Sequence, residues 1–426
     1  MKAIGIDIGT TSICFVTIDI NNGNIIKSKT INSNAFINSN KKYERIQSVN
    51  KIIKIIDDEI TDFIDREVEV IGVTGQMHGI LYVDKEGKAV SDLYTWQDKR
   101  GDEPYLDTTY AKFLNSYSGY GCVSDFYNKI NNLIPKNAET FCTIHDYVVM
   151  HLCNNKRPLI HISNACSFGC FDLKNKKYNI DVNVEFVDGY YIAGYYKGIP
   201  VSVAIGDNQA SVLSSICEED VLINIGTGSQ VSLISNREVD VPNIEIRPYF
   251  EGKYLLVGSS LCGGRAYSLL KDFYEKVYSY IPNMNEDIYE IMNKMIEKET
   301  NELKVNTTFS GTRNNPNIKG NILDISIDNF TPGALNRGVL KGIVNELYDM
   351  YLSIGEKKIN IIGSGNAVRK NKHLVNYIEE IFDNKIKVPN HIEEAAYGAC
   401  LYALLSNKNI KNMIEIKKII KYKSGD

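Results

Sequence analysis

The chain has 426 residues, of which 43% are hydrophobic and 23% charged, and its formal net charge is −4 at pH 7. This length predicts two or three domains, each able to bury its own core. The small negative charge gives no electrostatic basis for binding nucleic acid, and no run approaches the roughly 20 apolar residues of a membrane helix. The nine cysteines are scattered, which is typical of reduced thiols. We therefore expect a cytoplasmic protein without a leader peptide, a nucleic-acid partner or a membrane partner.

Apolar periodicity predicts the elements of the first half of the chain. β-Branched runs with turns at Gly9 and at Asn22-Gly23 predict three strands at the N-terminus. Isoleucines at helical spacing after Tyr43 predict a long amphipathic helix. The expected elements are strands within 3–32, a helix over 43–65, strands over 68–74 and 80–83, helices ending near 133 and 152, and a strand over 199–205.

The second half repeats the pattern of strands followed by alternating strands and helices. This order predicts an α/β protein with mixed sheets, in two domains, residues 1–213 and 219–426. The expected elements are a hairpin at 226, a strand over 254–258, helices over 263–280 and 287–302, and a helix that follows Pro332-Gly333 and ends near 351. After these come a strand over 358–362, a helix from 368, a strand over 386–388, a helix over 393–405 and a basic surface helix within 414–426 that frays at its end.

Two glycine–threonine turns repeat one pattern in the two halves. Residues 6–12 read IDIGTTS and residues 223–229 read INIGTGS. Their separation, 224 − 7 = 217 residues, is about half of the chain and predicts two similar domains. Either turn alone is also compatible with an ordinary hairpin. The duplication favours two loops that hold one polyphosphate through backbone N–H groups. The residues are Gly9, Thr10, Thr11 and Ser12 in the first loop and Gly226, Thr227 and Gly228 in the second.

The two copies differ at one charged position. Asp7 in the first copy stands where the second has Asn224. Only Asp7 can offer a negatively charged oxygen to a hydrated metal ion. We therefore expect Mg²⁺ to be held by Asp7 through water, with Asp207 as a second candidate.

Asp207 follows Gly206 at the end of an apolar strand and precedes a helical segment. An aspartate in this place is commonly a helix N-cap, and the sequence leaves that alternative open. As a general base, it would accept the proton of a substrate hydroxyl during phosphoryl transfer. The N-terminal end of the helix would keep it ionised before transfer.

Other loops that follow strands are candidate ligand sites. The glycines around Ser364 would let the backbone approach a nucleotide closely, although an ordinary β–α turn is equally compatible. Trp faces pack on sugar C–H groups, and the polar residues near the single Trp can bind hydroxyls. Taken singly, His78 and Trp96 are also typical of structural residues. The nucleotide candidates here are Gly363, Ser364, Gly365 and Asn366, and the sugar candidates are Gln76, Met77, His78, Trp96 and Asp98.

The chain resembles the FGGY carbohydrate kinases of the actin-like ATPase superfamily over nearly its whole length. The resemblance is carried by residues 75–79 (GQMHG), 95–98 (TWQD), 118–122 (SGYGC), 164–169 (NACSFG) and 256–264 (LVGSSLCGG). The loops at 118–122 and 164–169 are most similar to those of the sedoheptulokinases. The chain departs from the family pattern at His161-Ile162-Ser163, where members usually have Asp-x-Ser, and at Thr312, where sedoheptulokinases tend to have Glu.

The resemblance implies two actin-like (ribonuclease H-like) α/β domains with mixed sheets on either side of an interdomain cleft. It implies Asp207 as the catalytic base, ATP and Mg²⁺ as cofactors, and Gly311 near the nucleotide. Met77, His78, Trp96, Asp98 and Tyr120 would face the sugar.

The activity that the resemblance implies is transfer of the γ-phosphate to the terminal hydroxyl of a ketose, with sedoheptulose first. Xylulose or another ketose or polyol is the alternative substrate. An actin-like ATPase that binds or chaperones without sugar kinase activity is the alternative from another class. The expected partner is a small-molecule sugar, bound by a monomer or homodimer.

Overall fold

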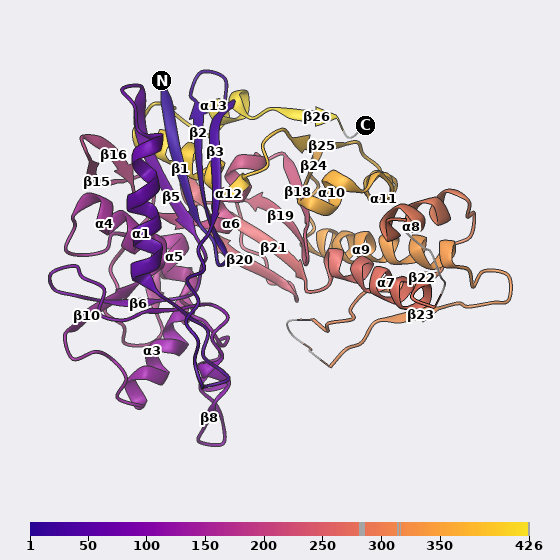
Figure 1. Ribbon diagram of the computed structural model, residues 1–426, viewed down its shortest axis with the longest axis horizontal. Helices are drawn as coiled ribbons and strands as arrows, with labels where there is room; N and C mark the ends of the chain where they lie inside the picture. The colour runs from indigo at the N-terminus through magenta and orange to yellow at the C-terminus, as the bar shows by residue number, and fades with distance from the viewer. Residues whose placement is uncertain (281–285, 313–314, 316, 425–426) are drawn as a thin grey trace. The chain divides into compact units, whose positions relative to one another are not determined.

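The computed structural model describes residues 1–280, 286–312, 315 and 317–424. The chain divides into two compact units (Figure 1). The first unit contains residues 1–214, 247–253 and 391–421, and the second contains 215–246, 254–390 and 422–426. Residues 247–253 and 391–421 therefore group with the first unit, whereas the sequence analysis places them in the second domain.

The first unit is built on a seven-stranded mixed sheet in the order β15-β16-β5-β1-β2-β3, with β17 also paired to β5. β1 and β2 are antiparallel, as are β2 and β3, whereas β5 runs parallel to β1. The strands are β1 (Lys2–Ile8), β2 (Ser12–Asp19), β3 (Ile25–Asn32), β5 (Val68–Gly75), β15 (Ile192–Tyr196), β16 (Ile199–Ser202) and β17 (Ile205–Gly206).

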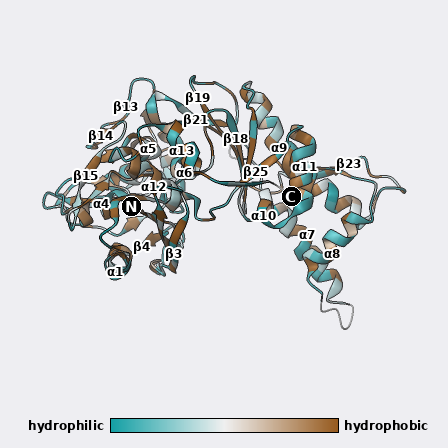
Figure 2. Ribbon diagram, turned by 90° about the horizontal axis from the view of Figure 1, so that it is seen from above, coloured by the Kyte–Doolittle hydropathy of each residue, from teal (hydrophilic) through white to brown (hydrophobic). Residues whose placement is uncertain are grey.

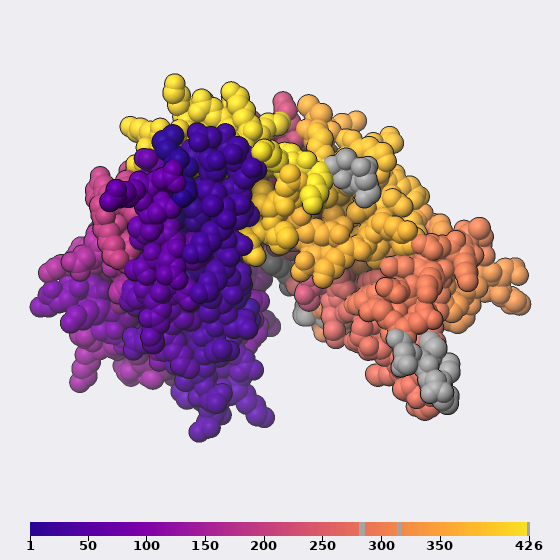
Figure 3. Space-filling view, turned by 45° about the horizontal axis from the view of Figure 1, so that its top comes forward, coloured from indigo at the N-terminus to yellow at the C-terminus, as the bar shows by residue number. Residues whose placement is uncertain are grey.

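Helix α12 (Glu394–Ser406) packs on this sheet at backbone contact distance. Gly5 of β1 and Gly72 of β5 are register partners, and a Cβ on either would lie within 2.0 Å of a helix carbonyl oxygen, that of Ala396 or Ala399. Glycine is therefore required at both positions. This contact explains why the late segment 391–421 belongs to the first unit, and Figure 3 shows its yellow residues beside the indigo N-terminal strands.

The other elements of the first unit are short strands and helices around the sheet. The helices are α1 (Val49–Ile60), η1 (Thr61–Phe63), η2 (Arg100–Asp102), α2 (Tyr110–Phe113), α3 (Gly121–Ile130), α4 (Ile144–Cys153), α5 (Ile162–Ser167), α6 (Asp207–Ser215), η3 (Phe250–Gly252) and α13 (Met413–Ile419). The strands are β4 (Ile46–Gln47), β6 (Leu81–Asp84), β7 (Leu93–Tyr94), β8 (Pro104–Tyr105), β9 (Thr108–Thr109), β10 (Ala138–Cys142), β11 (Ile160–His161), β12 (Phe171–Asp172), β13 (Lys177–Tyr178) and β14 (Phe186–Val187).

The second unit repeats the strand pattern of the first. Its sheet has the order β20-β21-β19-β18-β24-β25-β26, and β18, β19 and β21 form an antiparallel meander with β24 parallel to β18. Each unit therefore contains three antiparallel strands with a parallel strand beside the first, and this shared arrangement is the repeat that the two turns predict. The strands are β18 (Asp220–Ile225), β19 (Ser229–Ser235), β20 (Ile244–Pro248), β21 (Tyr254–Ser260), β24 (Asn360–Ser364), β25 (Ile386–Pro389) and β26 (Tyr422–Ser424).

Amphipathic helices pack around the second sheet, and Figure 2 shows hydrophilic and hydrophobic residues on the same helices, α8 among them. Long α9 begins with Pro332 in its first turn and ends at Ile354, close to the predicted end near 351. The helices are α7 (Gly263–Tyr278), α8 (Ile288–Glu297), α9 (Pro332–Ile354), α10 (Asn366–Lys370) and α11 (Lys372–Phe382), with a small hairpin of β22 (Lys304–Asn306) and β23 (Asn321–Leu323).

The largest differences between predicted and observed helices lie at two places. The helix predicted over 43–65 is confined to α1, because the Ser48 side chain caps its N-terminus and residues 46–47 pair with β7 instead. The tail predicted as one helix contains α13 and then β26, which pairs with β25 and so adds an edge strand to the sheet. Residues 425–426 of that predicted tail lie outside the described residues. Across the described residues, no helix has both the length and the apolar content to cross a membrane.

Candidate active site

Three strands of the first unit end at one edge of its sheet. Asp7 of β1 and Ile205 of β17 are both register partners of Thr74 in β5, and Gly206 pairs with Gly75. The Thr74 hydroxyl donates a hydrogen bond to the Ile205 carbonyl at 2.8 Å. Because the three strands are parallel, their carboxyl ends meet here, which is where ligands bind in open α/β sheets.

Asp7 presents a carboxylate at this edge. Burial, reinforced by the negative charges of Asp207 and Glu393, raises the pKa of Asp7 to about 7. Its Oδ1 is buried and has no hydrogen-bond partner among the residues that the structure describes. A buried carboxylate oxygen without a partner is costly, so this atom is suited to accept from a ligand or from water around a cation.

Asp207 is the first residue of α6 and directly follows β17. Burial raises its pKa to about 6, while the Arg247 guanidinium and the backbone N–H groups of Asn208 and Asp207 oppose the rise. The negative charge of Asp207 also contributes to the raised pKa of Asp7, so the two carboxyl groups interact. The two acidic residues selected from the sequence lie together at the edge of one sheet.

The loop after β5 packs against two other predicted sugar-binding loops. His78 has a positive φ of 73°, and its Nδ1–H donates to the Ser167 carbonyl at 2.8 Å. Its ring stacks on Tyr120, with centroids 4.1 Å apart and an interplanar angle of 9°. Buried Met77 lies against Gly206, where an added Cβ would be 2.7 Å from the Met77 Sδ.

Trp96 connects the predicted sugar loops to the first glycine–threonine turn. Its indole N–H donates to the Thr10 hydroxyl at 2.9 Å, and that hydroxyl donates to Gln76 Oε1 at 3.4 Å. Gln47 donates to the Thr10 carbonyl at 2.5 Å and accepts from Gln76 at 2.8 Å. The Thr10 side chain, predicted to bind nucleotide, thus contacts sugar candidates in this structure, while the Trp96 ring remains 45% exposed. Gly9, Thr11 and Ser12 complete the same turn.

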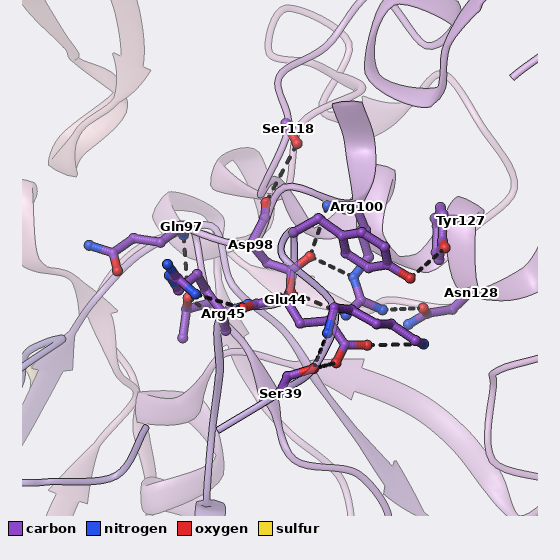
Figure 4. Close-up of polar contacts among 12 residues, drawn as sticks. Ser39, Glu44, Arg45, Gln97, Asp98, Arg100, Ser118, Tyr127 and Asn128 are labelled. Carbon is purple, nitrogen blue, oxygen red and sulfur yellow. Dashed lines mark hydrogen bonds and ion pairs between the residues drawn. The ribbon is translucent and has the colours of Figure 1, made fainter. Parts of the chain in front are cut away.

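Asp98, a predicted sugar-binding residue, is occupied by hydrogen bonds to protein groups in this structure. The side chain is fully buried. Its Oδ1 accepts from the Arg100 backbone N–H at 3.0 Å and Nε at 2.7 Å, and its Oδ2 accepts from the Arg45 backbone N–H at 2.9 Å and Arg100 Nη2 at 3.2 Å (Figure 4). These four bonds fill the acceptor sites of a carboxylate. Asp98 therefore holds the Trp96 loop through Arg100.

Replacing Asp98 with asparagine is expected to lower the free energy of unfolding by about 3–5 kcal/mol, because the buried Arg100 charge would lose its counter-ion. The Arg100 guanidinium, which also donates to Asn128 at 2.5 Å and lies 4.1 Å from the Tyr94 ring, would stay buried. Urea denaturation measures the change.

The matched control for that substitution is Asp58→Asn, which breaks the exposed Lys54–Asp58 pair. Exposed pairs contribute about 0–1 kcal/mol, so this variant should be nearly as stable as the parent. Equal stability losses for the two variants would contradict the buried-pair assignment.

The second glycine–threonine turn joins β18 and β19 in the second unit. The Gly226 N–H donates to the Gly228 carbonyl at 2.9 Å, and the Gly264 N–H donates to the Gly226 carbonyl at 2.9 Å. A Cβ on Gly264 would lie 2.4 Å from the Gly226 carbonyl oxygen. Because α7 begins with Gly263 and Gly264, its N-terminus can pack directly on the turn. Asn224, the counterpart of Asp7, donates to the Ser364 hydroxyl at 2.7 Å.

A pocket of about 550 Å³ opens beside this turn. That volume lies within the usual range of small-molecule sites. Its wall combines the turn, the first residues of α7 and α10, and the rings of Tyr267 and Tyr289, which are stacked with centroids 5.9 Å apart. The Tyr267 hydroxyl donates to Asn293 Oδ1 at 3.5 Å. The pocket therefore combines the backbone of the turn at one part with aromatic and amide groups at another.

Only some of the predicted nucleotide residues line this pocket. Gly226, Thr227 and Asn366 do. Gly365 has a φ of 86° and packs on the backbone of Ile225, which itself lines the pocket. The second-unit candidates outside the lining are Gly228, Gly363, Ser364, Gly365 and Gly311, and the first-turn candidates Gly9, Thr10, Thr11 and Ser12 are also outside it. The Gly311 N–H donates to the Thr308 carbonyl in its own turn.

Sequence reasoning missed three polar residues of the first-unit site. Arg247 reaches Asp207 from β20, Glu393 reaches Asp7 from the residue before α12, and Gln47 holds the Thr10 carbonyl from β4. None of the three lies in a glycine-rich loop or repeats a motif. Only the fold brings them to the ends of β1 and β17.

The chain is similar to the FGGY family of carbohydrate kinases. Residues 2–186 match the model of the FGGY family of carbohydrate kinases, N-terminal domain. Among curated proteins, the chain is 28% identical over 417 residues to the sedoheptulokinase of Mus musculus, covering 84% of this chain and 87% of that protein. It is 24% identical over 463 residues to a xylulose kinase of Staphylococcus epidermidis, covering 97% and 90%.

The fold is that of solved sugar kinases. The xylulose kinase of Rhodospirillum rubrum superposes with a TM-score of 0.84, covering 100% of this chain and 94% of that one at 15% sequence identity. The two mixed sheets are thus the ribonuclease H-like, actin-like pair that the sequence resemblance implies.

Proposed function

We propose that the chain is an ATP-dependent kinase that phosphorylates the terminal hydroxyl of a ketose, with sedoheptulose, giving the 7-phosphate, as the substrate. The observation that carries the proposal is the pair Asp7 and Asp207 at the carboxyl ends of neighbouring strands, beside the loop of residues 76–78. Phosphoryl transfer needs a base for the acceptor hydroxyl, charge neutralisation and positioning. The two carboxylates and the adjoining loops supply these requirements.

In this proposal Asp207 accepts the proton of the acceptor hydroxyl as the phosphorus–oxygen bond forms. A carboxylate whose pKa burial has raised to about 6 is ionised at neutral pH and still a better base than an exposed aspartate. Arg247 beside it favours the charged form before transfer.

The residues at Asp7 fit a hydrated divalent cation. Asp7 Oδ1 is a buried acceptor with no partner among the described residues, and Mg²⁺ commonly keeps its waters and binds through one or two carboxylates. Within the described residues, no group of three or more His, Cys, Asp or Glu side chains is arranged to hold a metal. Asp7 would therefore hold the ion through water, with Asp207 as the second candidate, and the bound ion would neutralise phosphate charge.

The pocket of the second unit is the proposed nucleotide site. Backbone N–H groups in a glycine-rich turn bind phosphate oxygens, and Gly226 and Thr227 supply such a turn at its wall. The stacked rings of Tyr267 and Tyr289 offer a flat apolar surface for the adenine. The phosphates would therefore lie at the Gly226 turn and the base near α8.

The sugar would bind in the first unit, against Trp96, His78 and Tyr120. Trp96 is the single tryptophan of the chain and is 45% exposed, so its fluorescence should report sugar binding directly. We expect sedoheptulose to quench or shift this emission at lower concentrations than xylulose or glycerol. Trp96→Phe should abolish the signal and weaken sugar binding about tenfold or more by loss of the larger ring face and its N–H bond to Thr10.

A coupled assay of ADP release over a panel of ketoses and polyols tests the substrate. The proposal predicts the highest kcat/KM for sedoheptulose. A higher value for xylulose would favour the alternative that the Staphylococcus epidermidis relative represents. ADP release at the same rate without any sugar would instead favour an ATPase binding module and contradict the proposed function.

A further inference from the structure

The strand that carries Asp207 is held largely by side chains. β17 has two residues and pairs with β5 at two positions. Each of three consecutive residues, the two of β17 and the residue before them, has a backbone group that is hydrogen-bonded to a side chain. Ala204 O accepts from Asn164 at 3.1 Å, Ile205 O accepts from Thr74 at 2.8 Å, and the Gly206 N–H donates to Ser163 Oγ at 3.1 Å.

The bond from Gly206 is the one nearest to the reacting group. Gly206 directly precedes Asp207, and Met77 and Gln209 already lie within 2.7 Å of where its Cβ would be. The peptide group that joins Gly206 to Asp207 therefore has little space to move. Ser163, whose side chain is 1% exposed, determines where that peptide lies.

His161 fixes the direction of the Ser163 hydroxyl. The Ser163 backbone N–H donates to His161 Nδ1 at 3.1 Å, so this nitrogen is an acceptor. The Ser163 O–H consequently donates to the same Nδ1 at 2.8 Å and turns an oxygen lone pair toward Gly206. The buried His161 ring also packs on Phe250 and Tyr402, with centroids 5.8 and 5.6 Å away, which holds it in place.

We propose that Ser163, oriented by His161, is a positioning residue that aims the Asp207 carboxylate at the acceptor hydroxyl. The proposal rests on the role of Asp207 in the proposed function. Loss of the Ser163 oxygen would leave the Gly206 N–H without its acceptor in a buried place. The carboxylate would then shift relative to the hydroxyl, and misplacement of a reacting group by about 1 Å can lower turnover about 10²-fold.

The test is a double-mutant cycle of Ser163→Ala and Asp207→Asn, with kcat measured in the ketose kinase assay. Ser163→Ala alone should lower kcat by about 10- to 100-fold, while the sugar dissociation constant from Trp96 fluorescence changes by less than about threefold. In the Asp207→Asn background, Ser163→Ala should cause no further loss, because residues that act as one unit are not additive. Ser163→Thr, which keeps the hydroxyl, should recover most of the turnover.

Ser202→Ala is the matched control. Ser202 is a fully buried serine in neighbouring β16, and its hydroxyl has no hydrogen-bond partner among the described residues. This variant should keep kcat within about twofold, since no bond is lost. An equal loss in Ser202→Ala would show a general effect of changing a buried serine and would overturn the proposal.

Other outcomes distinguish failure of this inference from failure of the proposed function. Normal kcat in Ser163→Ala, or additive losses in the cycle, would overturn the positioning role while leaving Asp207 as base. Normal kcat in Asp207→Asn would overturn the proposed function itself. If Ser163→Ala does not fold, His161→Phe keeps a ring at this position and removes both ring nitrogens, the Nδ1 acceptor of Ser163 among them. It should then lower kcat with unchanged sugar binding, and unchanged kcat would overturn the proposal.

Discussion

Asp207→Asn is expected to lower the kcat of ketose phosphorylation by about 10²–10⁴-fold, the usual contribution of a general base. The amide has nearly the same shape as the carboxylate, so the start of α6 should be preserved. It cannot accept the hydroxyl proton, and it removes the negative charge that faces Arg247. Steady-state kinetics at saturating ATP and sugar measure the loss.

Two controls accompany that measurement. Trp96 fluorescence should show sugar binding within a few-fold of the parent, because the sugar loops are unchanged. Asp181→Asn, at an exposed aspartate of the same unit, should have normal turnover. Turnover near the parental value in Asp207→Asn would exclude Asp207 as the base.

The pH dependence of the parent enzyme provides a related prediction. Burial raises the pKa of Asp207 to about 6, so its carboxylate is increasingly protonated as the pH falls below that value. Because only the ionised form accepts a proton, kcat/KM should fall by about tenfold or more per pH unit below about pH 6. The residual activity of Asp207→Asn should lack this acidic limb. An acidic limb of the same pKa in that variant would assign the titration to another group.

Asp7→Asn is expected to have the second largest effect, a loss of about 10²–10³-fold in kcat that more Mg²⁺ does not restore. Several kcal/mol of transition-state stabilisation are attributed to a bound metal ion, and each 1.4 kcal/mol is about tenfold. The substitution gives the first turn the residue that the second turn has at Asn224. It therefore tests the charge at this position with little change of shape.

The measurement for Asp7 is a Mg²⁺ titration of activity in parent and variant. We expect the half-activating concentration to rise in the variant as well as kcat to fall. Asp57→Asn, at an acidic residue that pairs with His151 away from the site, should have the parental titration. An unchanged half-activating concentration in Asp7→Asn would contradict the assignment of Asp7 as the metal anchor.

Local patterns predicted the framework of the site well. The two glycine–threonine turns lie between antiparallel strands as predicted, because a turn and its flanking strands are encoded within a few residues. Asp207 follows a strand and begins a helix, although the single predicted strand over 199–205 is divided into β16 and β17. The predicted role of each of these residues remains a proposal.

Long-range packing accounts for what the sequence did not indicate. Asp98 lies beside Trp96 in the chain, yet Arg100 and the backbone of Arg45 occupy its oxygens. Arg247 lies in an ordinary strand pattern, and Phe250 brings its segment to the first unit by packing on His161 and Tyr402. Glu393 lies near Asp7 because α12 packs on β1 and β5. No local signal encodes these tertiary contacts.

The most direct test of a ketose kinase with Asp207 as its base is the balance of products formed by the parent enzyme. Incubation with ATP, Mg²⁺ and sedoheptulose, followed by ³¹P and ¹³C NMR, measures ADP and the position of the transferred phosphate together. We expect one ketose phosphate, with its phosphate on the terminal carbon, for each ADP released. Equal amounts of ADP and inorganic phosphate, with the sugar unchanged, would contradict the account.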